Sequence, residues 1–149
     1  MYYYTNTLLN IKDMITIKDL SFSYNEKTVL KNITMNLEEG RIYGLLGENG
    51  VGKTTLLTLL CGLKKVKTGS IDIDGYNPYD RNPSFLSEQF YLSDDVAGAN
   101  MTAAGYARNY GKFWDKFDYD KFIEVMGVFE NDIDMKMNEM SCGQLKKTY

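Results

Sequence analysis

The segment that most constrains this 149-residue chain is Gly47-Glu48-Asn49-Gly50-Val51-Gly52-Lys53-Thr54, which has the spacing G-x-x-x-x-G-K-[ST]. It follows a short apolar run, Arg41 to Leu46, that predicts a parallel strand buried on both faces. It precedes Leu56 to Leu63, which is apolar nearly all round and predicts a buried helix. Glycines let such a loop wrap a phosphate with backbone N–H groups, and the helix N-terminus adds partial positive charge. The sequence therefore predicts a phosphate-binding loop.

Two side chains of this loop have the chemistry to hold a nucleotide. The Lys53 ammonium would bridge the β- and γ-phosphates, and the Thr54 hydroxyl would complete the octahedral shell of a Mg²⁺ ion. The formal net charge of −3 offers no general positive field for nucleic acid or an anionic membrane. Phosphate binding must therefore be local, and no nucleic-acid partner is expected.

Alternating apolar and polar residues predict strands on both sides of the loop. Ile15–Tyr24 and Val29–Leu37 alternate on either side of a polar turn, which predicts two antiparallel strands. Gly69–Gly75 alternates between glycines and predicts another strand. Asp72 and Asp74 lack the other oxygen ligands of a calcium loop, so they are interpreted as the polar face of that strand.

Helical spacing of apolar residues appears in the last third of the chain. Two helices are predicted, Met101–Phe113 and Asp120–Phe129. The acidic run over 115–139 is interpreted as a solvated face. The aromatic residues nearby are interpreted as packing residues rather than a ligand platform: Phe113, Trp114 and Phe117.

Several classes of site and location are excluded by composition. Cys61 and Cys142 lie far apart, which argues against a zinc site or a disulfide framework and fits a reducing compartment. The absence of histidine excludes Ser-His-Asp and Cys-His catalysis within this sequence. The first residues do not form a signal peptide, and no window has the roughly 18 apolar residues of a membrane span.

A second motif narrows the choice among phosphate-loop proteins. Met140-Ser141-Cys142-Gly143-Gln144 resembles the L-S-G-G-Q signature of ATP-binding cassette (ABC) proteins, and Gly47–Thr55 has that family's G-x-x-G-x-G-K-[ST]-T form. The resemblance covers about 14–149 and implies an α/β P-loop NTPase fold. Its antiparallel β subdomain and P-loop core would span about 14–93, and its helical subdomain about 94–149, after a leader at 1–13.

The resemblance also implies roles for individual residues. ATP would be held by the loop, with Thr55 included, and Tyr24 would stack on adenine, although an aromatic residue in a strand can also be a packing residue. After an expected strand at 84–87, a glutamine-loop residue would contact Mg²⁺; strand register favours Glu88 and residue type favours Gln89. Three residues of the signature would bind the γ-phosphate of ATP held on an opposing subunit: Ser141, Gly143 and Gln144.

The sequence departs from the family pattern in three ways. Met140 stands where leucine is usual, a change that is nearly volume-neutral. Cys142 stands where glycine is usual, which would cost on the order of 1 kcal/mol if the position requires a positive φ. The Walker B aspartate, catalytic glutamate and histidine that follow the signature in the family are not in this sequence. No catalytic set is therefore complete, and we expect the C-terminal part of the fold to be missing. Hydrolysis should then be negligible and ATP binding weaker than in a complete domain. Apolar surface should be exposed around Arg41–Leu46.

The function implied by the resemblance is that of an ATP-binding subunit of an ABC transporter. The complete subunit would hydrolyse ATP with Mg²⁺ to drive a separate membrane permease, and it would pair with a second nucleotide-binding subunit. It would be cytoplasmic and held at the inner face of the membrane through the permease. Two alternatives stay open: a soluble ABC ATPase of translation or DNA repair, and a nucleotide-binding fragment without catalysis.

Overall fold

The computed structural model describes residues 13–149, and residues 1–12 of the expected leader lie outside the described residues. The chain divides into two compact units. Unit 1 extends to Phe90 and contains the sheet and the phosphate loop, and unit 2 runs from Tyr91 to Tyr149 and is helical. Each unit is described by itself below.

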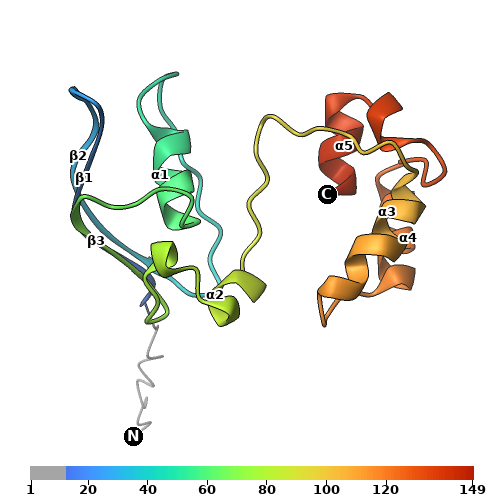
Figure 1. Ribbon diagram of the computed structural model, residues 1–149, viewed down its shortest axis with the longest axis horizontal. Helices are drawn as coiled ribbons and strands as arrows, with labels where there is room; N and C mark the ends of the chain where they lie inside the picture. Colours follow the sequence, from blue (N-terminus) through green and yellow to red (C-terminus); the bar gives the residue numbers. More distant parts are fainter. Residues whose placement is uncertain (1–12) are drawn as a thin grey trace, which may run out of the picture. The chain divides into compact units, whose positions relative to one another are not determined.

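Unit 1 is built on a three-stranded antiparallel sheet (Figure 1). Strand β1 (Asp13–Tyr24) lies in the centre, between β2 (Lys27–Glu38) and β3 (Thr68–Ile73). The predicted hairpin and the third strand are thus confirmed. Asp72 is exposed between the buried Ile71 and Ile73, as predicted for the polar face of β3. The prediction is wrong for Asp74, because β3 ends at Ile73 and Asp74 lies in the turn that follows, with a φ of 54°.

One helix, α1 (Lys53–Leu60), packs on this sheet through a single face. Leu56 and Leu59 join the buried cluster formed by the sheet residues Ile17, Leu20, Phe22, Leu30, Ile71 and Ile73 together with Phe85. Leu57 is 43% exposed, so the prediction of a helix buried all round is wrong for this structure. The reason is geometric, because an eight-residue helix touches the sheet along one side only.

The predicted parallel strand at Arg41–Leu46 is not formed among the described residues. Ile42 and Leu46 have relative exposures of 102% and 92%, and no strand of the described chain pairs with this segment. A buried parallel strand forms by hydrogen bonding to neighbouring strands, and none of the described strands pairs with this segment, which explains why it does not form a strand here. The predicted exposure of apolar surface in this segment is confirmed.

The strand expected at 84–87 is also wrong, because these residues form helix α2 (Pro83–Ser87). Asn82 is the N-cap, and its side chain accepts a hydrogen bond from Ser84 N–H at 2.9 Å. Proline at the first helical position has no N–H to leave unsatisfied and a φ that suits a helix. A short 3₁₀ helix, η1 (Pro78–Asp80), precedes it.

Unit 2 has three α-helices and two 3₁₀ helices: α3 (Ala103–Tyr110), η2 (Gly111–Phe113), α4 (Tyr119–Val128), η3 (Met137–Glu139) and α5 (Cys142–Thr148). The two predicted helices are confirmed, the first ending in the 3₁₀ turn η2. The core of unit 2 contains Ala103, Met126, Met137 and Leu145. Within residues 13–149, no helix is long and apolar enough to span a bilayer.

Candidate functional site

The phosphate loop joins the unpaired segment 41–46 to α1 and owes its course to glycines. Gly50 and Gly52 have φ values of 82° and 107°, in the left-handed region that favours glycine. A Cβ at Gly52 would lie 2.8 Å from both the Val29 and Leu30 side chains. Residue 52 must therefore lack a side chain for two reasons, its backbone conformation and its close packing against β2.

The Lys53 side chain folds back onto the loop that precedes it. Its Nζ donates to the Gly47 carbonyl oxygen at 2.7 Å and to the Glu48 carbonyl oxygen at 2.8 Å. An ammonium group has three donors and no acceptor. These two bonds tie the start of the loop to its last residues and place a positive charge against the loop backbone.

The start of α1 supplies further donors at the same place. Its N-cap is Gly52, which offers no side-chain cap, and the first turn contains no acidic residue. The first bond of the helical pattern is from Leu56 N–H to the Gly52 carbonyl at 2.9 Å, so the amides of residues 53–55 have no i−4 partner within the helix. Thr54 is exposed in this turn. The helix start, together with Lys53, can therefore bind an anion, and Thr54 can offer one oxygen to a cation.

The structure brings Tyr24 next to this first turn. The Tyr24 hydroxyl lies 3.4 Å from the Thr55 hydroxyl oxygen, and Thr55 is buried. Tyr24 as a residue is 43% exposed. An aromatic ring is thus present beside the phosphate loop, with part of its surface open to solvent, as stacking on a base requires.

The two candidates for the metal-contacting position follow α2. Glu88 is the C-cap of that helix. Gln89 Nε2 donates to the Cys61 carbonyl at 3.3 Å, just beyond the C-terminal end of α1, whereas Thr54 is in its first turn. Helix α1 is about 12 Å long at 1.5 Å per residue. The structure therefore does not bring the Gln89 side chain to Thr54, and the choice between Glu88 and Gln89 stays a prediction.

In unit 2, the signature residues begin helix α5 with a capping box. Ser141 Oγ accepts from Gln144 N–H at 3.2 Å, and Gln144 Oε1 accepts from Ser141 N–H at 2.9 Å. The Gln144 N–H, one of the predicted phosphate donors, is thus bound within the box. The Ser141 oxygen is the acceptor in this bond, so the box does not use its hydroxyl proton. A Cβ at Gly143 would meet only open space.

Cys142 fits the structure without backbone strain. It is the first residue of α5, its side chain is exposed, and it is not among the described residues with positive φ. The backbone-strain cost of a side chain at a position with positive φ therefore does not apply to Cys142.

Sequence reasoning missed a residue that holds the signature helix in place. The buried Asn131 Nδ2 donates to the Gln144 carbonyl at 2.8 Å and to Thr148 Oγ1 at 3.0 Å. Both partners lie more than ten positions away along the chain. Asn131 has no motif around it, so no local pattern could have identified it.

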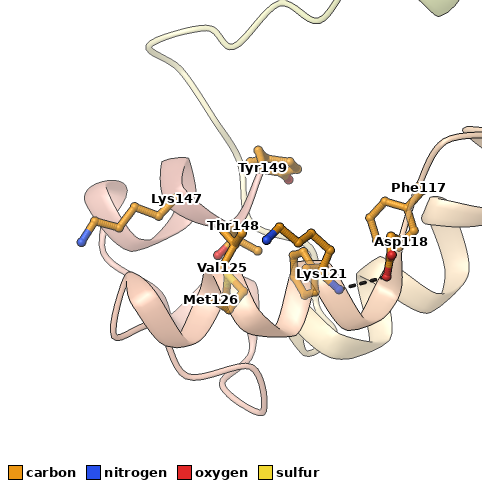
Figure 2. A pocket seen from close by; sticks show the side chains of 9 residues that line it. Phe117, Asp118, Lys121, Val125, Met126, Lys147, Thr148 and Tyr149 are labelled. Carbon is orange, nitrogen blue, oxygen red and sulfur yellow. Dashed lines mark hydrogen bonds between the residues drawn. The ribbon is translucent and has the colours of Figure 1, made fainter.

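A pocket of about 270 Å³ lies between α4 and the end of α5 (Figure 2). Near one end of it, Asp118 Oδ1 accepts from Lys121 N–H at 2.9 Å and caps α4. None of its lining residues belongs to the predicted nucleotide site: Phe117, Asp118, Lys121, Phe122, Val125, Met126, Lys147, Thr148 and Tyr149.

Comparison with known proteins identifies the relatives of this chain. The sequence profile of the ABC transporter family matches residues 30–149. The lantibiotic transport ATP-binding protein SrtF of Streptococcus pyogenes is 42% identical over 135 residues, which are 90% of this chain and 52% of that protein. The ergothioneine transport ATP-binding protein EgtV of Helicobacter pylori strain G27 is 31% identical over 145 residues, which are 92% of this chain and 67% of that protein.

Solved structures have the same fold. A protein of Pyrococcus furiosus described as an ABC transporter ATP-binding protein matches with a TM-score of 0.75 at 26% identity, over 90% of this chain and 66% of that one. CbiO1 of Clostridium perfringens matches with a TM-score of 0.69 at 22% identity, over 91% of this chain and 59% of that one, and shows the fold alone. The chain thus spans about half to two thirds of the length of these relatives. It belongs to the family of ABC transporter ATP-binding proteins and has part of their α/β P-loop fold.

Proposed function

We propose that this chain binds ATP through residues 47–55 as part of an ATP-binding subunit that powers an ABC transporter. The observation that carries the proposal is the loop tied back by Lys53 at an uncapped helix start. Backbone amides and one ammonium converge there, which is the arrangement that binds the phosphates of a nucleotide. A domain of net charge −3 needs such a local site to attract ATP.

The Mg²⁺ ion and the base would be bound on either side of this loop. The exposed Thr54 hydroxyl suits one position in the oxygen shell of Mg²⁺, with phosphate oxygens and water as the other ligands. The exposed part of the Tyr24 ring suits stacking on adenine. Glu88 and Gln89 remain the two proposals for a further contact to the metal or its water.

Catalysis would require a second subunit. The Ser141 hydroxyl proton and the Gly143 amide would bind the γ-phosphate of ATP held by a partner, while Gln144 would hold the cap that orients Ser141. A related fold has been solved as a dimer of an ATP-binding cassette bound to ADP and Pi, which supports a paired arrangement. A membrane permease, contacted from the cytoplasmic side, is the proposed partner of the pair. The 149-residue chain alone is proposed to bind ATP without steady turnover.

The test is titration of the 149-residue chain with ATP and Mg²⁺ in a calorimeter. Lys53→Ala removes the charge held against the loop backbone, so we expect the Kd for ATP to rise at least about tenfold, since a hydrogen bond to a charged group contributes about 1.5–3 kcal/mol. Lys31→Ala, at an exposed position on β2, is the control and should leave the Kd unchanged. Equal affinity of the native chain and Lys53→Ala would contradict the proposal, and so would ATP turnover by the native chain that Lys53→Ala abolishes.

A further inference from the structure

We propose that Lys64 is a positioning residue of the nucleotide site, which holds the Tyr24 ring in the orientation that stacks on the base. The Lys64 ammonium lies over the Tyr24 ring, 5.0 Å from its centroid. The inference rests on the proposed function and extends it to a residue outside the phosphate loop. Nothing in the local sequence around Lys64 predicts this contact.

The position of Lys64 is fixed by the way α1 ends. Gly62 has a φ of 67°, and its N–H donates to the Leu59 carbonyl at 3.1 Å, while Leu63 N–H donates to the Thr58 carbonyl at 2.9 Å. This is a glycine-terminated helix end. A Cβ at Gly62 would also collide with the backbone of Pro78, so this position requires glycine for its close packing as well as for its φ. The Lys64 side chain therefore starts from a backbone position fixed by this turn, two residues after Gly62.

Three contacts together restrain the Tyr24 ring. Its hydroxyl lies 3.4 Å from the Thr55 hydroxyl, and the Phe22 ring packs at a centroid distance of 5.1 Å and an interplanar angle of 82°. Lys64 adds a cation over the ring. The negative face of an aromatic ring attracts a cation, so this contact favours one orientation of the ring. With 43% of Tyr24 exposed, surface remains for a base.

A restrained ring binds a base with a smaller loss of side-chain entropy than a freely rotating one. Lys64 should therefore strengthen the binding of ligands that contain a base, and it should not affect the binding of a phosphate chain that lacks one. A lysine that acted instead through long-range attraction for phosphate would strengthen binding of both kinds of ligand. The two roles are thus separated by comparing ATP with inorganic tripolyphosphate.

The experiment measures the Kd of both ligands, with Mg²⁺, for the native 149-residue chain and for Lys64→Met, which keeps most of the apolar stem and removes the charge. We expect the Kd for ATP to rise about two- to fivefold, the range for an exposed cation–π contact, and the Kd for tripolyphosphate to stay the same. Lys64→Arg should restore ATP affinity. The matched control is Lys65→Met, because Lys65 lies over a different ring, Tyr79, at 5.8 Å, and it should change neither Kd.

A double-mutant cycle gives a readout that fold stability alone would not move. In a Tyr24→Leu background, Lys64→Met should have no further effect on ATP binding. An equal loss for both ligands, an unchanged or higher ATP affinity in Lys64→Met, or an undiminished effect in the Tyr24→Leu background would each overturn the inference. Failure of the proposed function is distinct, because then the native chain would bind neither ligand, or Lys53→Ala would leave both affinities unchanged.

Discussion

The two thiols of the chain lie in different surroundings, and this predicts different reactivity. Cys142 is exposed at the start of α5, whereas Cys61 is partly buried beyond the end of α1, where burial raises the pKa of its thiol. A raised pKa leaves less thiolate at a given pH, and thiolate is the reacting form. With a disulfide reagent at pH 8, we expect Cys142 to react fast and Cys61 to react slowly. The reaction rate of Cys61 should keep rising with pH above the pH at which an ordinary cysteine has ionised. Cys142→Ser should remove the fast phase only, and two equal rates in the native chain would contradict the prediction.

Individual residues differ in how far the sequence could predict them. The contacts of Lys53 are to carbonyls five and six positions away, within the motif itself, but the motif predicts contacts to phosphate and not these two carbonyl contacts. Lys64 and Asn131 act on side chains or carbonyls reached only after the chain has folded back. Such contacts depend on the packing of separate elements, and no spacing rule reports them.

The buried Asn131 amide donates to two residues of helix α5, and this gives a prediction about stability. Asn131→Ala removes the donors to the Gln144 carbonyl and Thr148 Oγ1. Thr148 Oγ1 still donates to the Gln144 carbonyl in this variant, at 3.0 Å. We therefore expect the free energy of unfolding to fall by about 1–3 kcal/mol, the sum for two lost hydrogen bonds of about 0.5–1.5 kcal/mol each. The measurement is urea denaturation followed by far-UV circular dichroism. Asn138→Ala, at an exposed position of η3, is the control and should change the free energy by less than about 0.5 kcal/mol. Equal stability of the two variants would show that Asn131 does not hold the helix.

The sequence predicted best those strands whose hydrogen-bonding partner is also among the described residues. Strand β1 pairs with its sequence neighbour β2, and the two strands supply four of the nine residues in the buried cluster of unit 1. The strand expected at 84–87 accompanied the family resemblance and did not take account of the Asn82-Pro83 helix start, which is a readable signal. The prediction at 41–46 failed for another reason. Its apolar run has the composition of a buried strand, but none of the described strands lies beside it.

The exposed segment 41–46 makes self-association the expected weakness of the chain as a whole. Ile42 and Leu46 are almost entirely exposed, and full burial of such a side chain contributes about 1.5–3 kcal/mol. Ile42→Lys combined with Leu46→Lys should therefore weaken self-association at least about tenfold and leave the midpoint of thermal unfolding unchanged, because neither side chain is packed. The measurement is the average mass against protein concentration by light scattering. Val128→Lys, at a position 74% exposed on α4, is the matched control for added charge and should have a smaller effect. If the double variant associates as strongly as the native chain, the contacts lie elsewhere. If its unfolding midpoint falls, the segment is packed in solution.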